Sequence, residues 1–402
     1  MAALPCEAQQ ISYLNYTYDD LRCKDADCFD ATALLTQFGQ DTELSKKIVL
    51  YAEEIKAWQQ PRDTPFTSEE AERIRCVWDE LKDARAVIEE LATHPHWDLD
   101  YVQFLRYTKS QGKMLLSSTS IRSMTYLTVL RAQIFLQDDE PLKAADVLFP
   151  FIQFARSYGM TAPTLLDGMT ATVIFRQVYK EIGTIVATHP DRLILLEKIF
   201  TTLQPLDSQE FFIFFFLKKD LLFEESYMPS EIPKNVLLFT FGEPIDESTP
   251  FMEKLLPMIR NLILEHVYLD YFFNKERAIN ELRWGYIHLG TLYEYGLFDQ
   301  ADAYVEKYTN NAHFELYLLR FEKTLVSSGL NIFPKIAHSS IKTKIRYALL
   351  RLRVAELLGT PLVEIDPYNR KPFIRNKDGK WASVGRDGII DTTDDVTEEA
   401  ER

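Results

Sequence analysis

The sequence predicts an all-α protein, built as an array of antiparallel helix pairs, with a small C-terminal module of irregular and β structure. Apolar residues recur at three- and four-residue steps over most of residues 41–360, which is the spacing of amphipathic helices. Glycine is rare, with 14 residues, and runs of alternating β-branched residues are absent. A β-sandwich or a doubly wound parallel sheet is therefore difficult to place.

Five segments are expected along the chain. Residues 1–40 show no sustained period and predict an irregular lead-in, whereas residues 41–226 and 250–360 predict two halves of the helical array. Residues 227–249 lie between these halves and contain three prolines and a glycine, so we expect a break there. Residues 361–402 form the C-terminal module, which combines an acidic loop with a polar tail.

The first predicted helix pair shows the pattern most clearly. Apolar residues from Leu44 to Trp58 lie on one face of a helix that Pro61 ends. Thr67 and Glu70 have the spacing of a capping box, and they open a second helix that we expect to run to about His94. The two helices are expected to pack as a hairpin.

Length and charge exclude several classes of function. The chain has 402 residues, more than the ~250–300 at which a single core stops growing, so two domains or an elongated array is expected. Its 60 acidic and 45 basic residues give a formal net charge of -15. Because no basic stripe offsets this charge, we expect no nucleic-acid partner. No apolar run reaches the ~20 residues of a membrane-spanning helix.

The N-terminal cysteines bear on localisation. Residues 1–10 lack the basic and apolar regions of a secretory signal. Leu4-Pro5-Cys6 matches the remnant of a lipoprotein cleavage site, which would anchor the chain through Cys6, although an ordinary cysteine near a terminus is the simpler interpretation. Cys23 and Cys28 stand in a polar, turn-rich stretch where a local disulfide can close, and their spacing leaves open whether it does.

Two windows of the array resemble the tetratricopeptide repeat, whose small and large residues let paired helices pack closely. The windows cover about 50 residues, without a regular ~34-residue period elsewhere. The resemblance implies a TPR-like α-solenoid that binds a peptide or protein on a concave surface, whereas any close helix crossing also favours small residues. The matching positions are Ala132, Phe135, Asp139, Ala144 and Leu148 in the first window, and Leu289, Gly290, Tyr293, Gly296, Phe298, Ala301 and Val305 in the second.

Recognisable catalytic motifs are absent from the sequence. It contains no GxSxG elbow, GxxxxGK[ST] phosphate loop, GxGxxG fingerprint or HExxH metalloprotease motif. We therefore predict neither catalytic nor organic-cofactor residues. An α/α-type helical enzyme, a hydrolase or lyase with an unrecognised carboxylate pair, is the alternative.

The C-terminal module carries the candidate metal site. Four aspartates, Asp387, Asp391, Asp394 and Asp395, fall within nine positions of a segment in which Gly385 and Gly388 favour tight turns. Hard oxygen ligands on a bent loop suit Ca²⁺, which accepts roughly six to eight oxygens. The spacing does not match an EF-hand, and a solvated acidic tail is the alternative interpretation.

This module resembles the calcium-binding C-terminal loop of the major pseudopilins of type II secretion. In that loop an Asp-Pro-aromatic-x-x-x-Pro segment, here residues 366–372, leads through short strands to Ser-x-Gly-x-Asp-Gly, here residues 383–388. The resemblance implies that Asp387, Asp394 and Asp395 bind calcium, that Val384 offers a carbonyl oxygen, and that Asp391 is an additional candidate. It covers about 35 residues, and because the pseudopilin N-terminal hydrophobic helix is lacking, it implies no role in filament assembly.

These observations predict a non-enzymatic, protein-binding helical scaffold of the bacterial cell envelope, on its periplasmic side, with a calcium-stabilised C-terminal module. The expected partner is another protein, and the sequence does not define the oligomeric state. The alternatives are the α/α-type enzyme and a cytoplasmic helical adaptor with an unstructured tail.

Overall fold

The structure is a computed structural model that describes residues 27–39, 42–59, 64–101, 117–162, 164–206, 275–294, 296–317 and 333–397. The chain divides into two compact units, which are described separately. The larger comprises residues 16–223 and 336–402, and the smaller comprises residues 1–15 and 224–335. The predicted break at residues 227–249 lies outside the described residues.

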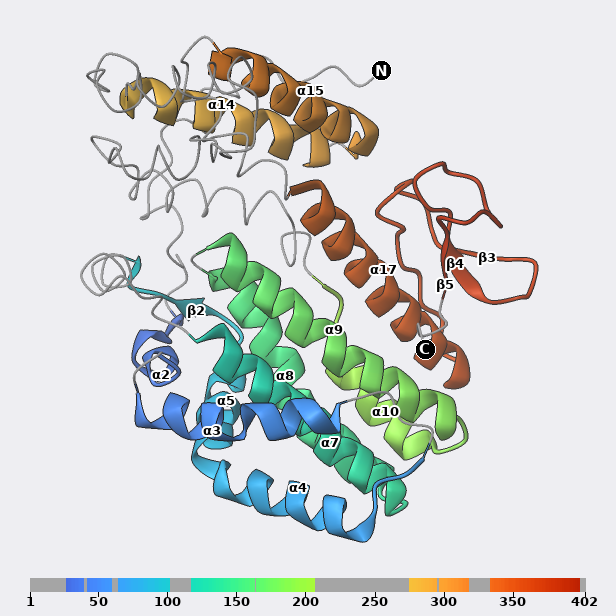
Figure 1. The fold of residues 1–402 in the computed structure, drawn as a ribbon. Coiled ribbons are helices and arrows are strands. Elements are labelled where there is room, and N and C mark those ends of the chain that lie inside the picture. Colours follow the sequence, from blue (N-terminus) through green and yellow to red (C-terminus); the bar gives the residue numbers. More distant parts are fainter. Residues whose placement is uncertain are drawn as a thin grey trace, which may run out of the picture. The chain divides into compact units, whose positions relative to one another are not determined.

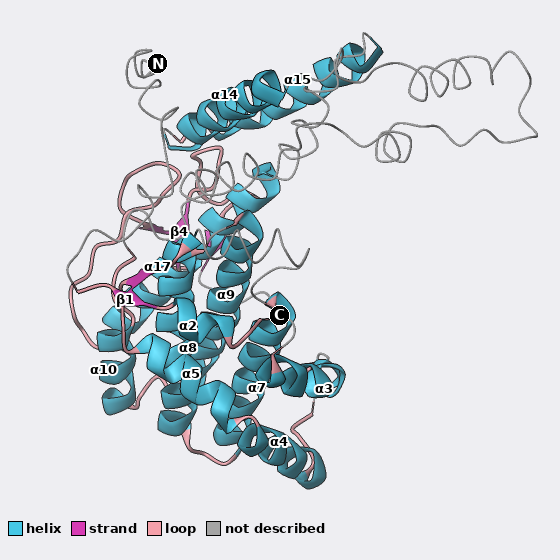
Figure 2. Cartoon of the chain, turned by 90° about the vertical axis from the view of Figure 1, so that its left-hand side faces the viewer, coloured by secondary structure: helices cyan, strands magenta, loops and turns pink. Residues whose placement is uncertain are grey.

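Helices make up most of the described chain, and strands are confined to short segments (Figure 2). The predicted all-α class is therefore confirmed, together with the small β structure near the C-terminus, whereas the solenoid arrangement stays a prediction. The described helices of the larger unit are α2 (Thr32–Thr36), α3 (Glu43–Trp58), α4 (Ser68–Glu80), α5 (Lys82–Ala92), α7 (Ser118–Gln137), α8 (Pro141–Thr161), α9 (Leu165–Thr188) and α10 (Leu193–Thr202), with most of α17 (Phe333–Leu357).

Helices α7, α8 and α9 pack against one another in the larger unit and form its centre (Figure 1). The outer helices α3 and α4 contact α7, and α5 and α10 contact α8. Large aromatic side chains fill the interior, including Phe154 and Tyr158 of α8 and Phe175 of α9, which are completely buried. Burial of such side chains supplies most of the driving force that holds these helices together.

Side-chain caps define several of the helix starts. Thr67 accepts a hydrogen bond from the Glu70 amide, and the Glu70 side chain accepts one from the Thr67 amide, so the predicted capping box is confirmed. The prediction of a single second helix up to about His94 is wrong. The segment is broken at Leu81 into α4 and the separate helix α5. The break lets α4 pack on α7 while α5 packs on α8, a tertiary requirement that overrides a continuous local pattern.

A short parallel strand pair ties the lead-in to the helical body. Strand β1 (Phe29–Asp30) pairs with β2 (Trp97–Asp98), and the Phe29 ring stacks on the His94 ring with 3.9 Å between centroids. Cys28, immediately before β1, is disulfide-bonded. Cys6 and Cys23 lie outside the described residues.

The smaller unit contains the helix pair α14 (Lys275–Glu294) and α15 (Phe298–Tyr317), which pack against each other. Gly296 in the turn has a φ of 71°, a conformation that favours glycine. Leu289 and Ala301 are completely buried. Over both units, no described helix combines the length and the apolarity that crossing a membrane requires.

The C-terminal module packs on α17 within the larger unit (Figure 1). Its three short strands, β3 (Ile374–Arg375), β4 (Trp381–Ser383) and β5 (Val396–Thr397), form an antiparallel sheet in the order β3-β4-β5. One face of this sheet joins the apolar stripe of α17 in a common core. The buried residues of that core are Ile345, Leu349, Leu352, Phe373 and Val396.

A buried ion pair joins α17 to the start of the module. Arg351 donates from Nε to the Leu203 carbonyl oxygen at 2.7 Å, and its Nη1 pairs with the Glu364 carboxylate. The two charged side chains are only 6% and 18% exposed. The ring of Tyr347, on the same helix, lies 4.9 Å from that of Phe175 in α9. The module and the helical body are therefore joined through α17.

Candidate metal centre in the C-terminal module

Asp366 organises the framework from which the acidic loop extends. The side chain is 1% exposed, and its carboxylate accepts hydrogen bonds from the Tyr368 amide at 2.9 Å, the Ser383 hydroxyl at 2.8 Å and the Val384 amide at 3.1 Å. Burial raises the pKa of Asp366, and these hydrogen bonds oppose the shift. This carboxylate fixes the end of β4, where the loop begins, against the turn that follows Asp366.

The loop between β4 and β5 brings three of the predicted metal ligands together. Carboxylate oxygens of Asp387, Asp394 and Asp395 all lie within 4.8 Å of one another. Three carboxylates at this separation repel one another, and a divalent cation would remove the repulsion. The three carboxylates are close enough together to contact one cation.

Backbone amides hold these carboxylates in place. Asp394 Oδ2 accepts hydrogen bonds from the amides of Arg386 at 2.5 Å and Asp387 at 3.2 Å. Asp395 Oδ2 accepts one from the Asp391 amide at 2.6 Å. A hydrogen bond from Thr392 is the main cause of a lowered pKa at Asp394, so its charged form is favoured.

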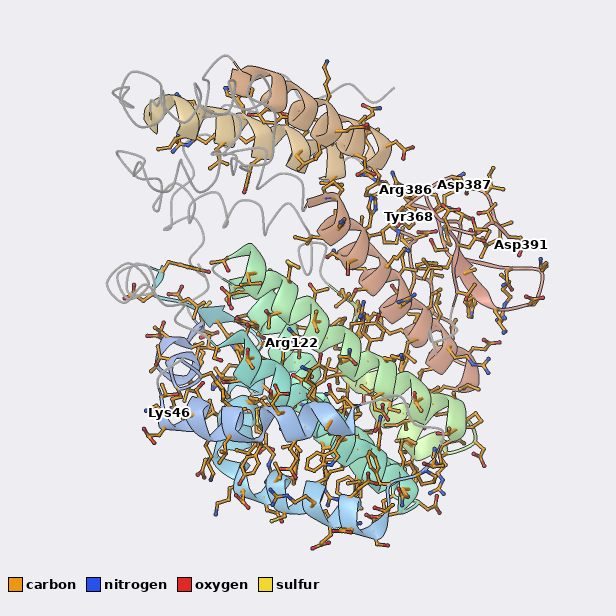
Figure 3. All side chains as sticks on the ribbon, viewed as in Figure 1. Lys46, Arg122, Tyr368, Arg386, Asp387 and Asp391 are labelled. Carbon is orange, nitrogen blue, oxygen red and sulfur yellow. The ribbon has the colours of Figure 1, made fainter. Side chains whose placement is uncertain are left out.

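The other two predicted ligands, Asp391 and Val384, are not part of this group of carboxylates. Asp391 has a φ of 67°, and its Oδ1 accepts from the Lys377 amide at 3.4 Å. It is not a member of the carboxylate group, and Figure 3 shows Asp387 and Asp391 at separate positions on the loop. Val384 is buried, and its amide donates to Asp366. The structure therefore groups three of the four predicted aspartates.

The donor chemistry of this group fits calcium. Three carboxylates supply at least three hard oxygens, and the remaining positions of a site with roughly six to eight oxygens can be filled by carbonyl groups and water. The loop is also connected to α17, because Arg386 Nη1 lies 3.2 Å from His338 Nε2.

Gly385 is required by the way the loop folds onto Asp394. Gly385 has a φ of 64°, and a Cβ atom there would lie 2.5 Å from Asp394 Oδ2 and 2.9 Å from the Asp394 backbone carbon. Gly388 has a φ of 72°, but a Cβ atom there would meet nothing within 4 Å. The two positions therefore share backbone strain and differ in steric clash.

We expect Gly385→Ala to lower the free energy of unfolding by about 3 kcal/mol, from left-handed strain and overpacking together. Gly388→Ala, the matched control, should lose only the strain of about 1 kcal/mol. Chemical unfolding of the two variants measures the difference. Equal losses would show that the contact between Gly385 and Asp394 does not constrain the loop.

No protein-family model, curated protein or solved structure matches this chain. The resemblances to pseudopilins and to the tetratricopeptide repeat thus remain predictions.

Proposed function

We propose that this protein is a non-enzymatic, protein-binding helical scaffold of the bacterial cell envelope, whose C-terminal module is stabilised by calcium and contacts the partner. The helical body supplies a rigid support, and the module supplies a surface of distinct chemistry. The observation that carries the proposal is an exposed apolar face on the module's sheet.

That face is defined by the register of the chain before and within β3. Ile365 pairs with Pro372, and the Phe373 amide donates to the Glu364 carbonyl oxygen, a register that places Val363 opposite Ile374. Side chains alternate between faces along a strand. Val363, Ile365, Pro372 and Ile374 therefore share one face, called here the outer sheet face.

One face of this strand pair is buried against α17, and the other is exposed to solvent. Phe373 is buried in the core with α17, and Glu364 pairs with Arg351. On the outer sheet face, Val363, Ile365 and Ile374 are 71%, 52% and 41% exposed. Adjacent exposed aliphatic side chains on an ordered surface are typical of a protein-binding site. This surface supports a protein partner for the module.

The calcium proposal rests on the position of the acidic loop. The loop joins β4 to β5, and both strands contribute to the sheet that supports the outer face. A cation bound by Asp387, Asp394 and Asp395 would hold a segment with few apolar residues in its folded form. Calcium would then strengthen partner binding indirectly, by ordering the sheet.

We expect calcium at saturating concentration to raise the melting temperature of the wild-type protein by several degrees, because it binds the folded state alone. Asp387→Asn and Asp394→Asn should abolish the increase, since each removes a charge from the cluster. Asp378→Asn, in the exposed β3–β4 turn, is the matched control and should retain it. Thermal unfolding with calcium and with chelator tests this, and an unchanged wild-type midpoint would contradict the calcium proposal.

The disulfide at Cys28 supports the proposed compartment. Disulfides persist in oxidising environments such as the bacterial periplasm and are rare in the cytosol. Thiol labelling of the protein isolated from its native compartment tests the localisation. A reduced Cys28 would favour the cytoplasmic adaptor instead.

Comparative capture from envelope extract tests the protein-binding role. Wild-type protein, a Val363→Asp/Ile374→Asp double variant and an Ile194→Asp control would be immobilised in calcium. Ile194 is 77% exposed on α10, outside the module. The proposal expects one or more proteins to be retained by wild type and control and lost from the double variant. Identical retention by all three would contradict it.

A further inference from the structure

The module's sheet has one further strand-like segment beyond its three named strands. Residues 362–365, called here the edge segment, pair with the chain that leads into β3, on the side of β3 opposite β4. Alternate side chains of this segment face opposite ways. Leu362 packs against the core with α17, whereas Val363 and Ile365 are 71% and 52% exposed. The edge segment therefore has the alternation of a half-buried strand.

The backbone of Ile365 points away from the sheet. The Glu364 carbonyl oxygen, just before it, accepts a hydrogen bond from the Phe373 amide at 3.2 Å. The Asp366 amide, just after it, donates to the Lys371 carbonyl oxygen at 2.8 Å. In an antiparallel pair, two such bonds enclose a residue whose own N–H and C=O are directed to the opposite side. Within the part of the chain that the structure describes, the backbone of Ile365 makes no hydrogen bond.

Val363 presents its backbone in the same direction, because the period of a strand is two residues. Its N–H and C=O also form no hydrogen bond to any described residue. Natural sheet edges are commonly blocked by charged side chains, prolines or bulges. Here Pro361 lies just before the edge segment, and the outward-facing residues are valine and isoleucine. The edge can therefore accept a further strand through main-chain hydrogen bonds.

Charge at one end of the edge segment narrows the kind of strand that fits. Arg370 and Lys371 are exposed in the turn that joins this segment to β3. Asp366, the one carboxylate of that turn, is 1% exposed and accepts its hydrogen bonds from within the module. A strand that continues past Ile365 would bring its next residues beside the two cations. An acidic side chain at that position would be attracted to them.

We propose that the edge segment binds an extended peptide strand of the partner protein by β-sheet addition. Main-chain groups of the peptide pair with the N–H and C=O groups of Val363 and Ile365. Aliphatic side chains at alternate positions of the peptide extend the outer sheet face, and an acidic residue lies beside Arg370 and Lys371. The inference rests on the proposed scaffold function and specifies the chemistry of its partner.

A phage-displayed library of random peptides, about ten residues long, is the probe. Selection on the intact protein in calcium should enrich sequences with aliphatic residues at alternate positions, followed by an acidic residue. A saturating synthetic copy of an enriched peptide should slow hydrogen exchange at the Val363 and Ile365 amides, since both become hydrogen-bonded. Failure to enrich any peptide would overturn the proposal. So would enriched peptides that leave exchange at both amides unchanged.

Ile365→Pro removes the outward N–H and keeps an apolar side chain, and Ile365→Val is the matched control that retains the N–H. Proline is tolerated on an edge strand where the N–H faces solvent. We expect the dissociation constant of the enriched peptide to rise about tenfold in Ile365→Pro, the scale of one lost hydrogen bond, and to stay unchanged in the control. Equal affinities of the two variants, both folded, would overturn strand addition. The exchange measurement on wild-type protein decides the matter if Ile365→Pro does not fold.

The inference and the scaffold function fail separately. A protein captured from envelope extract might depend on the outer sheet face and yet bind Ile365→Pro and Ile365→Val equally. That result would contradict strand addition and leave the scaffold function supported. Protection of the Val363 and Ile365 amides by peptide, with no protein retained from extract, would support the edge segment as a strand-binding site and contradict the scaffold function.

Discussion

Replacement of Arg351 by methionine is expected to lower the free energy of unfolding by about 3–5 kcal/mol, the usual effect of removing one partner of a buried ion pair. Glu364 would be left with a carboxylate that is 18% exposed and without its cation. The Leu203 carbonyl oxygen would also lose its hydrogen bond from Nε. Both losses fall where α17 joins the module to the helical body.

Urea unfolding at neutral pH would measure this effect, with Arg353→Met as the matched control. Arg353 lies on the same helix, but its side chain is 43% exposed and pairs with Glu356 within one helical turn. Such surface pairs contribute ~0–1 kcal/mol. Adding Glu364→Gln to Arg351→Met should recover much of the lost stability, because it removes the unpaired charge. A loss below about 1 kcal/mol in the single variant would show that the ion pair does not hold the module.

Replacement of Glu181 by glutamine is expected to raise the free energy of unfolding by about 3 kcal/mol at pH 8 and to leave it nearly unchanged at about pH 4 or below. Glu181 lies on α9 and is 7% exposed, and its carboxylate accepts a hydrogen bond from Gln133 at 3.1 Å. Burial is the main cause of a pKa raised to about 7. The charged form is therefore disfavoured in the folded protein.

The sign of this pH dependence follows from proton binding. Glu181 keeps its proton up to about pH 7 in the folded state, whereas an unfolded glutamate releases it near pH ~4.3. The wild-type protein thus loses stability as pH rises between these values, and the full penalty is present above pH ~7. Glutamine has no proton to release and can keep a hydrogen bond to Gln133.

Chemical unfolding at several pH values would compare Glu181→Gln with Glu197→Gln, whose side chain is exposed on α10. The difference in stability between Glu181→Gln and wild type should grow from pH 5 to pH 8. The control should show no such growth. A difference that is constant with pH would mean that Glu181 does not carry a raised pKa.

Local sequence was sufficient for much of the fold. The Thr67–Glu70 capping box depends on residues three positions apart, and spacing alone predicted it. The break at Leu81 was not predictable in this way, since the apolar period continues through it. Its cause lies in the different helices against which α4 and α5 pack. A residue-by-residue pattern does not contain that information.

The sequence predicted only part of the candidate site, because the rest depends on contacts between residues far apart in the chain. The aspartate spacing pointed to four residues, and the loop brings three of them, Asp387, Asp394 and Asp395, together. It did not show that Asp391 stands outside the group, because that depends on the turn conformation at this residue. The structural role of Asp366, whose carboxylate bonds to residues 17 and 18 positions away, was also missed. Its buried hydrogen bonds are long-range consequences of the fold.

The packing of the module determines how its function should be tested. Ile345, Leu349 and Leu352 of α17 share a core with Phe373 and Val396 of the module. Deletion of the module would expose this apolar stripe and destabilise α17. Substitutions on the outer sheet face avoid this problem, because those side chains already face water.

The most direct test of the scaffold proposal is the dissociation constant of a captured partner for wild-type protein and for the Val363→Asp/Ile374→Asp variant, measured in calcium. We expect the variant to bind at least tenfold more weakly and to unfold at the same denaturant concentration as the wild-type protein. Equal dissociation constants for the two proteins, both fully folded, would contradict the role of the outer sheet face in binding a partner.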